Sequence, residues 1–141
     1  MRTFGIERER FIMSREQIVP AIGILLPRVH ETAKNNNLPE KLFSYELFAG
    51  QIEDRTPPCR NLEEIKSALV LNDKIMSATA KQLGLAFDYS EIIDPDKITA
   101  LEVNPFDSRH KNIWSSISLK KRIAASIVAG ERIKRTEQKL Q

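Results

Sequence analysis

The first extended segment of the chain, TFGIERERFIM (residues 3–13), carries acidic and basic residues in strict alternation. Successive side chains of a β-strand point to opposite faces, so Glu7 and Glu9 share one face, with their stems about 7 Å apart, and Arg8 and Arg10 share the other. Two carboxylates on a rigid strand suit Mg²⁺, which proteins commonly hold through a few carboxylates and substrate phosphates. The pair is therefore a candidate metal site.

A second extended stretch, LFSYELFAGQIEDR (residues 42–55), supplies a third acid, Glu53, with the hydroxyl of Thr56 three residues later. If this strand lies beside the first, Glu53 joins the magnesium site. The alternative is an exposed strand whose acids form cross-strand ion pairs with bases such as Arg55, which contribute little to stability. Spacing alone leaves both readings open.

Two helices are expected to position these strands. The stretch SREQ (residues 14–17) fits a capping box of Ser14 with Gln17. Apolar residues then recur every three or four positions, Pro27 is expected to kink the helix, and NNNLP (residues 35–39) ends it. This first stripe comprises Ile18, Ile22, Leu25, Val29 and Ala33.

The clearer helix follows Pro57 and Pro58, which stop the second extended stretch. Asn61 is its expected cap with Glu64 as capping-box partner, and Gly84 its C-terminal cap. The stripe expected to face the core comprises Leu62, Ile65, Leu69, Asn72, Met76, Thr79 and Leu83. Gly50 marks a bulge or bend in the preceding strand.

The remainder of the chain predicts short strands over residues 85–93 and 98–103 around a turn at Asp94, and a short helix over residues 108–117 that packs Trp114. Residues 121–133 alternate Ile and Ala and favour a strand, followed by a basic tail over residues 134–141. We expect residues 1–141 to form one α+β domain in which long helices pack on an antiparallel sheet.

Composition excludes several classes of protein. The longest apolar run is too short and too interrupted by proline to span a bilayer, and the N-terminus lacks a secretory signal, so we expect a cytoplasmic protein without a membrane partner. The single cysteine, Cys59, forms no internal disulfide and is read as a small buried hydrophobe. Nine Lys or Arg against two Glu make the chain basic from Arg109 onward, but no interleaved aromatics or Gly-rich arm accompany them, which argues against nucleic-acid binding.

Two separated motifs resemble one known family. GIERERFI is similar to the G-x-E-x-E opening of the bacterial and plant-like glutamate–cysteine ligases and their carboxylate–amine ligase relatives, and ELFAGQIEDRTPPCRNLEEI resembles their E-x-x-x-x-Q-x-E-x-x-T-P-P-C-x-x-L-x-E segment in order and distance. The second motif is the specific one. The resemblance continues weakly through the following helix and at DSRHKNIWSSI and RIAASIVAG, so it covers the whole chain but only the N-terminal part of a full-length family member.

The resemblance implies the N-terminal portion of a glutamine-synthetase-like ligase fold and an ATP- and Mg²⁺-dependent reaction, in which the γ-carboxylate of glutamate becomes an acyl phosphate that the amine of cysteine, or another amine, attacks. Catalytic and metal-binding roles would fall to Glu7, Glu9 and Glu53. Supporting or substrate-binding roles would fall to Glu46, Gln51, Thr56 and, as a basic partner for the carboxylates of glutamate, Arg55.

The chain departs from the family pattern in two respects, and these departures leave more than one function open. Where the family continues with an H-x-H-x-G strand, this chain reads ERIKRTEQKLQ, and it has no Gly-rich phosphate loop. We therefore expect a truncated or incomplete ligase domain that is inactive in isolation, completed by a second copy of itself or by a complementing chain. The alternative is a non-catalytic binding or assembly module derived from the same fold.

Overall fold

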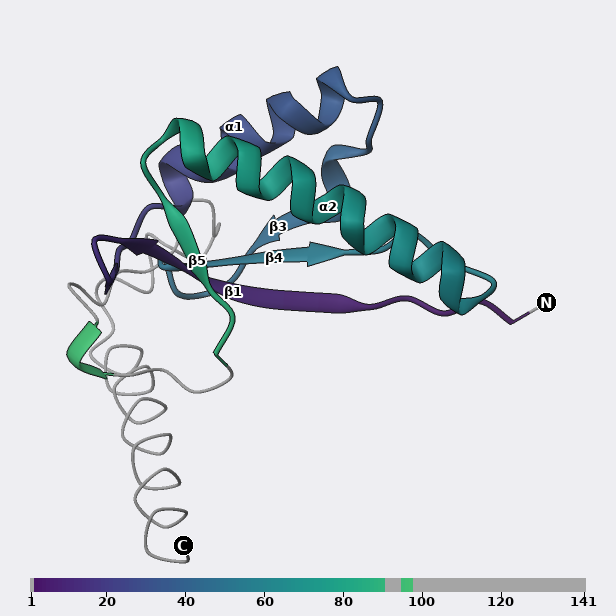
Figure 1. Cartoon of the computed structure of the whole chain (residues 1–141), viewed down its shortest axis with the longest axis horizontal. Coiled ribbons are helices and arrows are strands. Elements are labelled where there is room, and N and C mark those ends of the chain that lie inside the picture. Colours follow the sequence, from purple (N-terminus) through teal and green to yellow (C-terminus); the bar gives the residue numbers. More distant parts are fainter. Residues whose placement is uncertain (1, 91–94, 98–141) are drawn as a thin grey trace, which may run out of the picture.

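Five strands form one antiparallel sheet, and two helices lie together on one side of it (Figure 1). The computed structural model describes residues 2–90 and 95–97. The strands are β1 (Glu7–Ser14), β2 (Gln17–Ile18), β3 (Phe43–Tyr45), β4 (Gln51–Arg55) and β5 (Ala86–Asp88); the helices are α1 (Ile22–Asn35) and α2 (Leu62–Gln82), with single 3₁₀ turns at Glu40–Leu42 and Pro95–Lys97. The α+β class and the antiparallel sheet expected from the sequence are confirmed.

β1 is the strand on which the sheet is organised. Its N-terminal half pairs with β4, its C-terminal half pairs with β2 and β5, and β3 pairs with the far side of β4. The register places Glu9 opposite Glu53 and Glu7 opposite Arg55. The two extended stretches singled out in the sequence are therefore direct neighbours.

The main core fills the space between the sheet and the helices. Ile12 of β1, Ile52 of β4 and Phe43 of β3 are buried against the helices, and alternation sends Phe11 and Met13 of β1 to the opposite face. There they form a smaller cluster with Ile18 and Phe48. The helix residues buried in the main core are Ile22, Leu25, Leu26, Val29 and Ala33 of α1 and Ile75, Met76 and Ala80 of α2.

The predicted capping box at Ser14 and Gln17 is wrong, because these residues are opposite each other in a β-hairpin. The two-residue loop between them, Arg15 and Glu16, has positive φ angles of 48° and 65° at both positions, as a tight hairpin turn that follows the twist of its strands requires. Ile18 consequently belongs to β2 and the smaller cluster, and the helix begins only at Ile22.

From Ile22 onward the predicted stripe of α1 is buried, and the helix continues through Pro27 to Asn35. The asparagine run ends it as expected, with Asn37 in the left-handed region at φ 58°. His30 is partly buried at the edge of this stripe, where its Nε2 donates a hydrogen bond to the carbonyl of Phe43 at 2.9 Å. The histidine fastens α1 to β3.

α2 begins and ends as predicted. The Asn61 side chain accepts a hydrogen bond from the Glu64 N–H at 2.9 Å, while the Glu64 carboxylate accepts one from the backbone N–H of Arg60 at 2.7 Å rather than from Asn61. Gly84 has φ 68° beyond the last turn. One member of the predicted stripe is wrong: Leu62 is 61% exposed because it lies in the first turn of the helix, whereas Leu69 and Leu83 are half-buried.

The second extended stretch is not one strand but a hairpin of β3 and β4, joined by a loop from Glu46 to Gly50. Gly50 marks the bend, as expected: a Cβ there would lie 2.8 Å from the Phe48 ring and 3.0 Å from Ile18. β4 ends before Pro57 and Pro58, and Cys59 is buried, with its Sγ 3.1 Å from the Pro57 carbonyl.

Several predictions fall outside the described residues: the turn at Asp94, the strand over residues 98–103, the helix with Trp114, the strand over residues 121–133 and the tail over residues 134–141. Within the described part, neither helix is both long and apolar enough to cross a membrane.

Candidate functional site

Three carboxylates from three segments converge on the face of the sheet opposite the helices. Glu9 and Glu53 are partners across β1 and β4, and Glu46 reaches them from the start of the loop after β3. Each offers a carboxylate oxygen, and these oxygens all lie within 4.8 Å of one another. We refer to Glu9, Glu46 and Glu53 as the acid cluster.

The donor set of the acid cluster fits a hard divalent cation. Mg²⁺ binds oxygen at about 2.1 Å, so two oxygens on one ion lie at most about 4.2 Å apart. The oxygens of the acid cluster lie within 4.8 Å of one another, and at most one pair of three octahedral ligands can be opposite, so the carboxylates would have to move closer together to bind one ion. Glu53 is buried, Glu46 half-buried and Glu9 exposed, so an ion would be held from below and remain open to phosphate and water on the outer side.

Electrostatic crowding in the acid cluster is visible in Glu46. Burial, a hydrogen bond with Glu53, and repulsion from Glu9 and Glu53 raise the pKa of Glu46 from an ordinary 4.5 to about 7. In the absence of a cation the cluster therefore takes up a proton near neutral pH.

One basic residue already faces the acid cluster. Arg55 is opposite Glu7 in the register, yet its guanidinium forms an ion pair with Glu53, two residues back along β4 and on the same face. The alternative reading predicted a cross-strand ion pair between Arg55 and the acids of the first strand, but the acid that Arg55 pairs with, Glu53, lies on its own strand. The Arg55 side chain is 39% exposed, so it is free on its outer side to meet a further anion.

The structure does not bring all the predicted site residues together. Glu7 lies on the same face as Glu9, as predicted, but is not among the three acids whose oxygens converge. Thr56 is buried and fixes the entry to β1: its Oγ1 accepts a hydrogen bond from the Ile6 N–H at 3.0 Å, and its own N–H donates to the Ile6 carbonyl at 2.9 Å. In this structure, Thr56 therefore binds the backbone of Ile6.

An open hollow of about 480 Å³ adjoins the acid cluster. The described residues that line it are Glu7, Arg8, Glu9, Phe11, Gln51, Tyr89 and Ser90. Its volume lies within the range of roughly 300–1,000 Å³ typical of small-molecule sites. Gln51, predicted as a substrate contact, does line this hollow. Tyr89 and Ser90 were missed by the sequence reasoning, because nothing local indicates that the chain beyond β5 returns to the start of β1.

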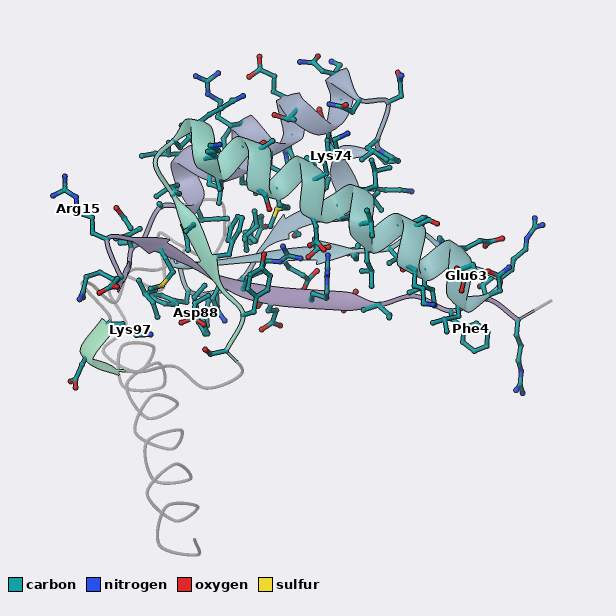
Figure 2. All side chains as sticks on the ribbon, viewed as in Figure 1. Phe4, Arg15, Glu63, Lys74, Asp88 and Lys97 are labelled. Atoms are coloured by element: carbon teal, nitrogen blue, oxygen red, sulfur yellow. The ribbon has the colours of Figure 1, made fainter. Side chains whose placement is uncertain are left out.

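The helix-facing side of β1 carries a partly buried ionic network. Figure 2 shows all described side chains as sticks on the ribbon, in the view of Figure 1. The Arg10 guanidinium is fully buried and donates to Asp54 at 2.7 Å and to Asp73 of α2 at 3.0 Å. Arg8 donates to the same two carboxylates at 2.8 and 2.9 Å, and Asn72 donates to Asp54 at 3.0 Å. The network joins β1, β4 and α2.

The charges of this network support one another. Although burial opposes both shifts, hydrogen bonds from Arg8 and Arg10 lower the pKa of Asp73, and hydrogen bonds to Asp54 and Asp73 raise the pKa of Arg8. Asp54 and Asp73 were not predicted. The alternation in β1 could have indicated them. It places Arg8 and Arg10 on the face that the helices cover, where a buried guanidinium group needs carboxylate partners.

Comparison of this chain with family models, curated proteins and solved structures finds no match.

Proposed function

We propose that this chain binds Mg²⁺ and the phosphates of ATP on the acid face of β1 and β4, as part of an ATP-dependent carboxylate–amine ligase of the glutamate–cysteine ligase type. The observation that carries the proposal is the convergence of Glu9, Glu46 and Glu53 within 4.8 Å. Both motifs of the family resemblance contribute to it: Glu9 comes from G-x-E-x-E, and Glu46 and Glu53 come from E-x-x-x-x-Q-x-E.

The proposed chemistry suits such a face. Transfer of a phosphoryl group requires positioned charge more than a protein nucleophile, and metal ions neutralise the phosphate oxygens. Glu9, Glu46 and Glu53 would hold Mg²⁺, which would supply positive charge against the phosphate oxygens while the γ-carboxylate of glutamate is phosphorylated. The exposed side of Arg55 would attract a carboxylate of glutamate, and Gln51 would contact substrate in the hollow.

The proposal extends to the fold. In the described part of the chain the helices cover one face of the antiparallel sheet and the acid cluster lies on the other, an arrangement that would suit the glutamine-synthetase-like ligase fold implied by the resemblance. Substrates would be glutamate, cysteine or another amine, and ATP. A second copy or a complementing chain would complete the site.

Calorimetric titration of the full-length chain with ATP, with and without Mg²⁺, tests the proposal. We expect Mg²⁺-dependent binding that falls at least tenfold in Glu9→Gln and in Glu53→Gln, because each substitution keeps the size of the side chain and removes a charged oxygen ligand. Glu63→Gln is the matched control, since Glu63 is an exposed acid on α2, remote from the sheet face. Unchanged binding in both cluster variants would refute the assignment.

Glu7→Gln distinguishes two versions of the site. Because Glu7 lies outside the converging oxygens, its substitution should weaken Mg²⁺-dependent binding less than Glu9→Gln does. An effect of Glu7→Gln equal to that of Glu9→Gln would instead support the arrangement predicted from the sequence, in which both acids of β1 bind the ion.

One observation favours the alternative, a non-catalytic binding or assembly module. The ion pair between Arg55 and Glu53 supplies the acid cluster with a counter-cation from within the chain, so a metal is not required to balance Glu53. A wild-type chain that binds no ATP with or without Mg²⁺, and that captures a protein partner equally well after Glu9→Gln, would favour this alternative.

A further inference from the structure

We propose that the edge of β1 from Ile6 to Glu9 binds an extended segment of a partner protein, with Lys or Arg of that segment opposite Glu7 and Glu9. The segment would add a strand to the sheet, antiparallel to β1 and in line with β5. This inference goes beyond the proposed function, and it stands whether or not the acid cluster binds Mg²⁺.

The edge is open because β5 ends early. β5 pairs with the C-terminal half of β1, on the side away from β4, and Phe11 is the last residue of β1 that it reaches. A continued β5 would place Ser90 opposite Glu9, but the Ser90 N–H donates instead to Asp88 Oδ1 at 2.8 Å. Among the described residues, no strand pairs with β1 before Phe11 on this side (Figure 1).

The backbone groups of Glu7 and Glu9 point to this open edge. In an antiparallel sheet, successive residues of a strand direct their N–H and C=O groups to alternate neighbours. The Ile6 carbonyl accepts from the Thr56 N–H at 2.9 Å, and the Ile12 N–H donates to the residue just before β4 at 2.8 Å. Even-numbered residues therefore face β4, and the odd-numbered acids present their donors and acceptors outward, as a template for a further strand.

There is room for a strand beside these groups. The hollow of about 480 Å³ is lined by three successive residues of β1, Glu7, Arg8 and Glu9, and by Tyr89 and Ser90. Because successive side chains of a strand lie on opposite faces, the hollow extends along the edge of β1 and not over one face alone. An extended segment in the hollow would follow the line that β5 leaves at Ser90.

The side chains along the edge select the chemistry of the segment. Residues directly opposite each other on antiparallel strands are neighbours, so the exposed Glu9 and Glu7 favour a basic residue opposite each of them. Arg8, which two carboxylates already bind, disfavours a base opposite it, and Ile6, 37% exposed, favours an apolar residue. From its N-terminus, the segment therefore reads basic, neutral, basic, apolar.

A second copy of this chain is a poorer occupant than such a partner. Two copies of this edge, paired antiparallel over the ERER stretch, would place acids opposite acids. Like charges directly opposite each other destabilise a pair of strands. A segment with bases at these positions meets no such repulsion.

Fluorescence anisotropy tests the proposal, with a labelled hexapeptide, Lys-Thr-Lys-Val-Ser-Val, titrated with the full-length chain without Mg²⁺ or nucleotide. N-methylation of both lysine residues removes the N–H groups that face Glu9 and Glu7. Binding should weaken about tenfold or more, because two backbone hydrogen bonds are lost. N-methylation of the threonine and the first valine is the matched control. Their N–H groups point away from β1, so the affinity should stay within about twofold.

Two variants test the charges. Glu7→Gln should weaken binding of the unmodified peptide about two- to fivefold, as expected for an exposed pair of opposite charges across two strands. Glu31→Gln, which removes an exposed acid on α1, should leave it unchanged. An equal effect of Glu7→Gln and Glu31→Gln would overturn the selection of a basic segment.

Three other results would overturn the added strand itself. The first is an equal loss of affinity for the two methylated peptides, which would show that no backbone pairing takes place. The second is the absence of saturable binding to the wild-type chain. The third is a dimer in sedimentation experiments that the peptide converts to monomer, which would make a second copy the native occupant of the edge.

Discussion

Asp54 is expected to be the most sensitive position in the described part of the chain. It is 0% exposed and accepts hydrogen bonds from Arg8 at 2.8 Å, Arg10 at 2.7 Å and Asn72 at 3.0 Å. Asp54→Asn keeps the shape of the side chain and one acceptor oxygen but removes the charge. The fully buried guanidinium of Arg10 is then left with Asp73 alone as its carboxylate partner.

The expected cost follows from these contacts. Removing one partner of a buried ion pair costs about 3–5 kcal/mol, because the other charge stays buried without compensation. Asp73 remains 3.0 Å from Arg10 but its side chain is 42% exposed, so it compensates only in part. We therefore expect the lower end of that range, about 3 kcal/mol, which is a large fraction of the roughly 5–15 kcal/mol that stabilises a typical domain.

Urea unfolding followed by far-ultraviolet circular dichroism measures this cost. The matched control is Glu31→Gln, which breaks the exposed pair of Arg28 and Glu31 on α1, where the side chains are 62% and 61% exposed and 3.3 Å apart. That pair should contribute no more than about 0.5 kcal/mol. A midpoint shifted no further by Asp54→Asn than by Glu31→Gln, at the same dependence on urea, would show that the network does not hold the sheet to α2.

Three further predictions concern single positions. Glu46 keeps its proton up to about pH 7 in the folded chain but loses it near pH 4.5 when unfolded. The stabilisation from this raised pKa is therefore complete below pH 4.5 and is lost as the pH rises through 7. In urea titrations, the free energy of unfolding of the wild type should fall over that interval relative to that of Glu46→Gln. Glu16→Gly should increase the free energy of unfolding by roughly 1 kcal/mol and raise the melting temperature, because Glu16 has φ 65°, a conformation that glycine adopts without strain. An unchanged melting temperature would mean that the turn is not left-handed at this position. Gly50→Ala should cost about 1–3 kcal/mol in urea, because its Cβ would meet Phe48 at 2.8 Å and Ile18 at 3.0 Å, and an unaltered midpoint would contradict this packing.

The sequence was informative wherever a pattern had one structural solution. Alternation in ERER assigns Glu7 and Glu9 to one face of β1 whatever lies beside it, and Asn61 and Gly84 bracket α2 because a capping side chain and a left-handed glycine are strong local signals. The spacing of Ser14 and Gln17, by contrast, is compatible with two different local structures. The same spacing fits a capping box and the flanks of a two-residue hairpin loop, and Arg15 and Glu16 give no glycine or asparagine to indicate the turn.

The composition of the acid cluster could not be predicted, since period-two alternation fixes the face of a strand but not its register. A slip of two residues would keep every side chain on its face and place Glu7, instead of Glu9, opposite Glu53. The choice is made by distant contacts, such as the hydrogen bond from the Ile12 N–H to the Gly50 carbonyl at 2.8 Å. The position of Glu46 in the cluster depends, in addition, on the path of the loop that follows β3.

The two faces of β1 differ in how their charges are balanced. On the helix face, two guanidinium groups meet two carboxylates, so the network of Arg8, Arg10, Asp54 and Asp73 is neutral and structural.

On the open face, Glu7 and the three acids of the cluster meet one described guanidinium, that of Arg55. The neutral network behind the strand cannot offset this excess. Burial, the hydrogen bond with Glu53 and the repulsion from Glu9 and Glu53 together raise the pKa of Glu46, so within the chain itself a proton neutralises part of this charge. A divalent ion brought by a nucleotide would relieve the same repulsion with two charges in place of one. The imbalance between the two faces of a single strand is therefore the physical reason to look for Mg²⁺·ATP at Glu9, Glu46 and Glu53.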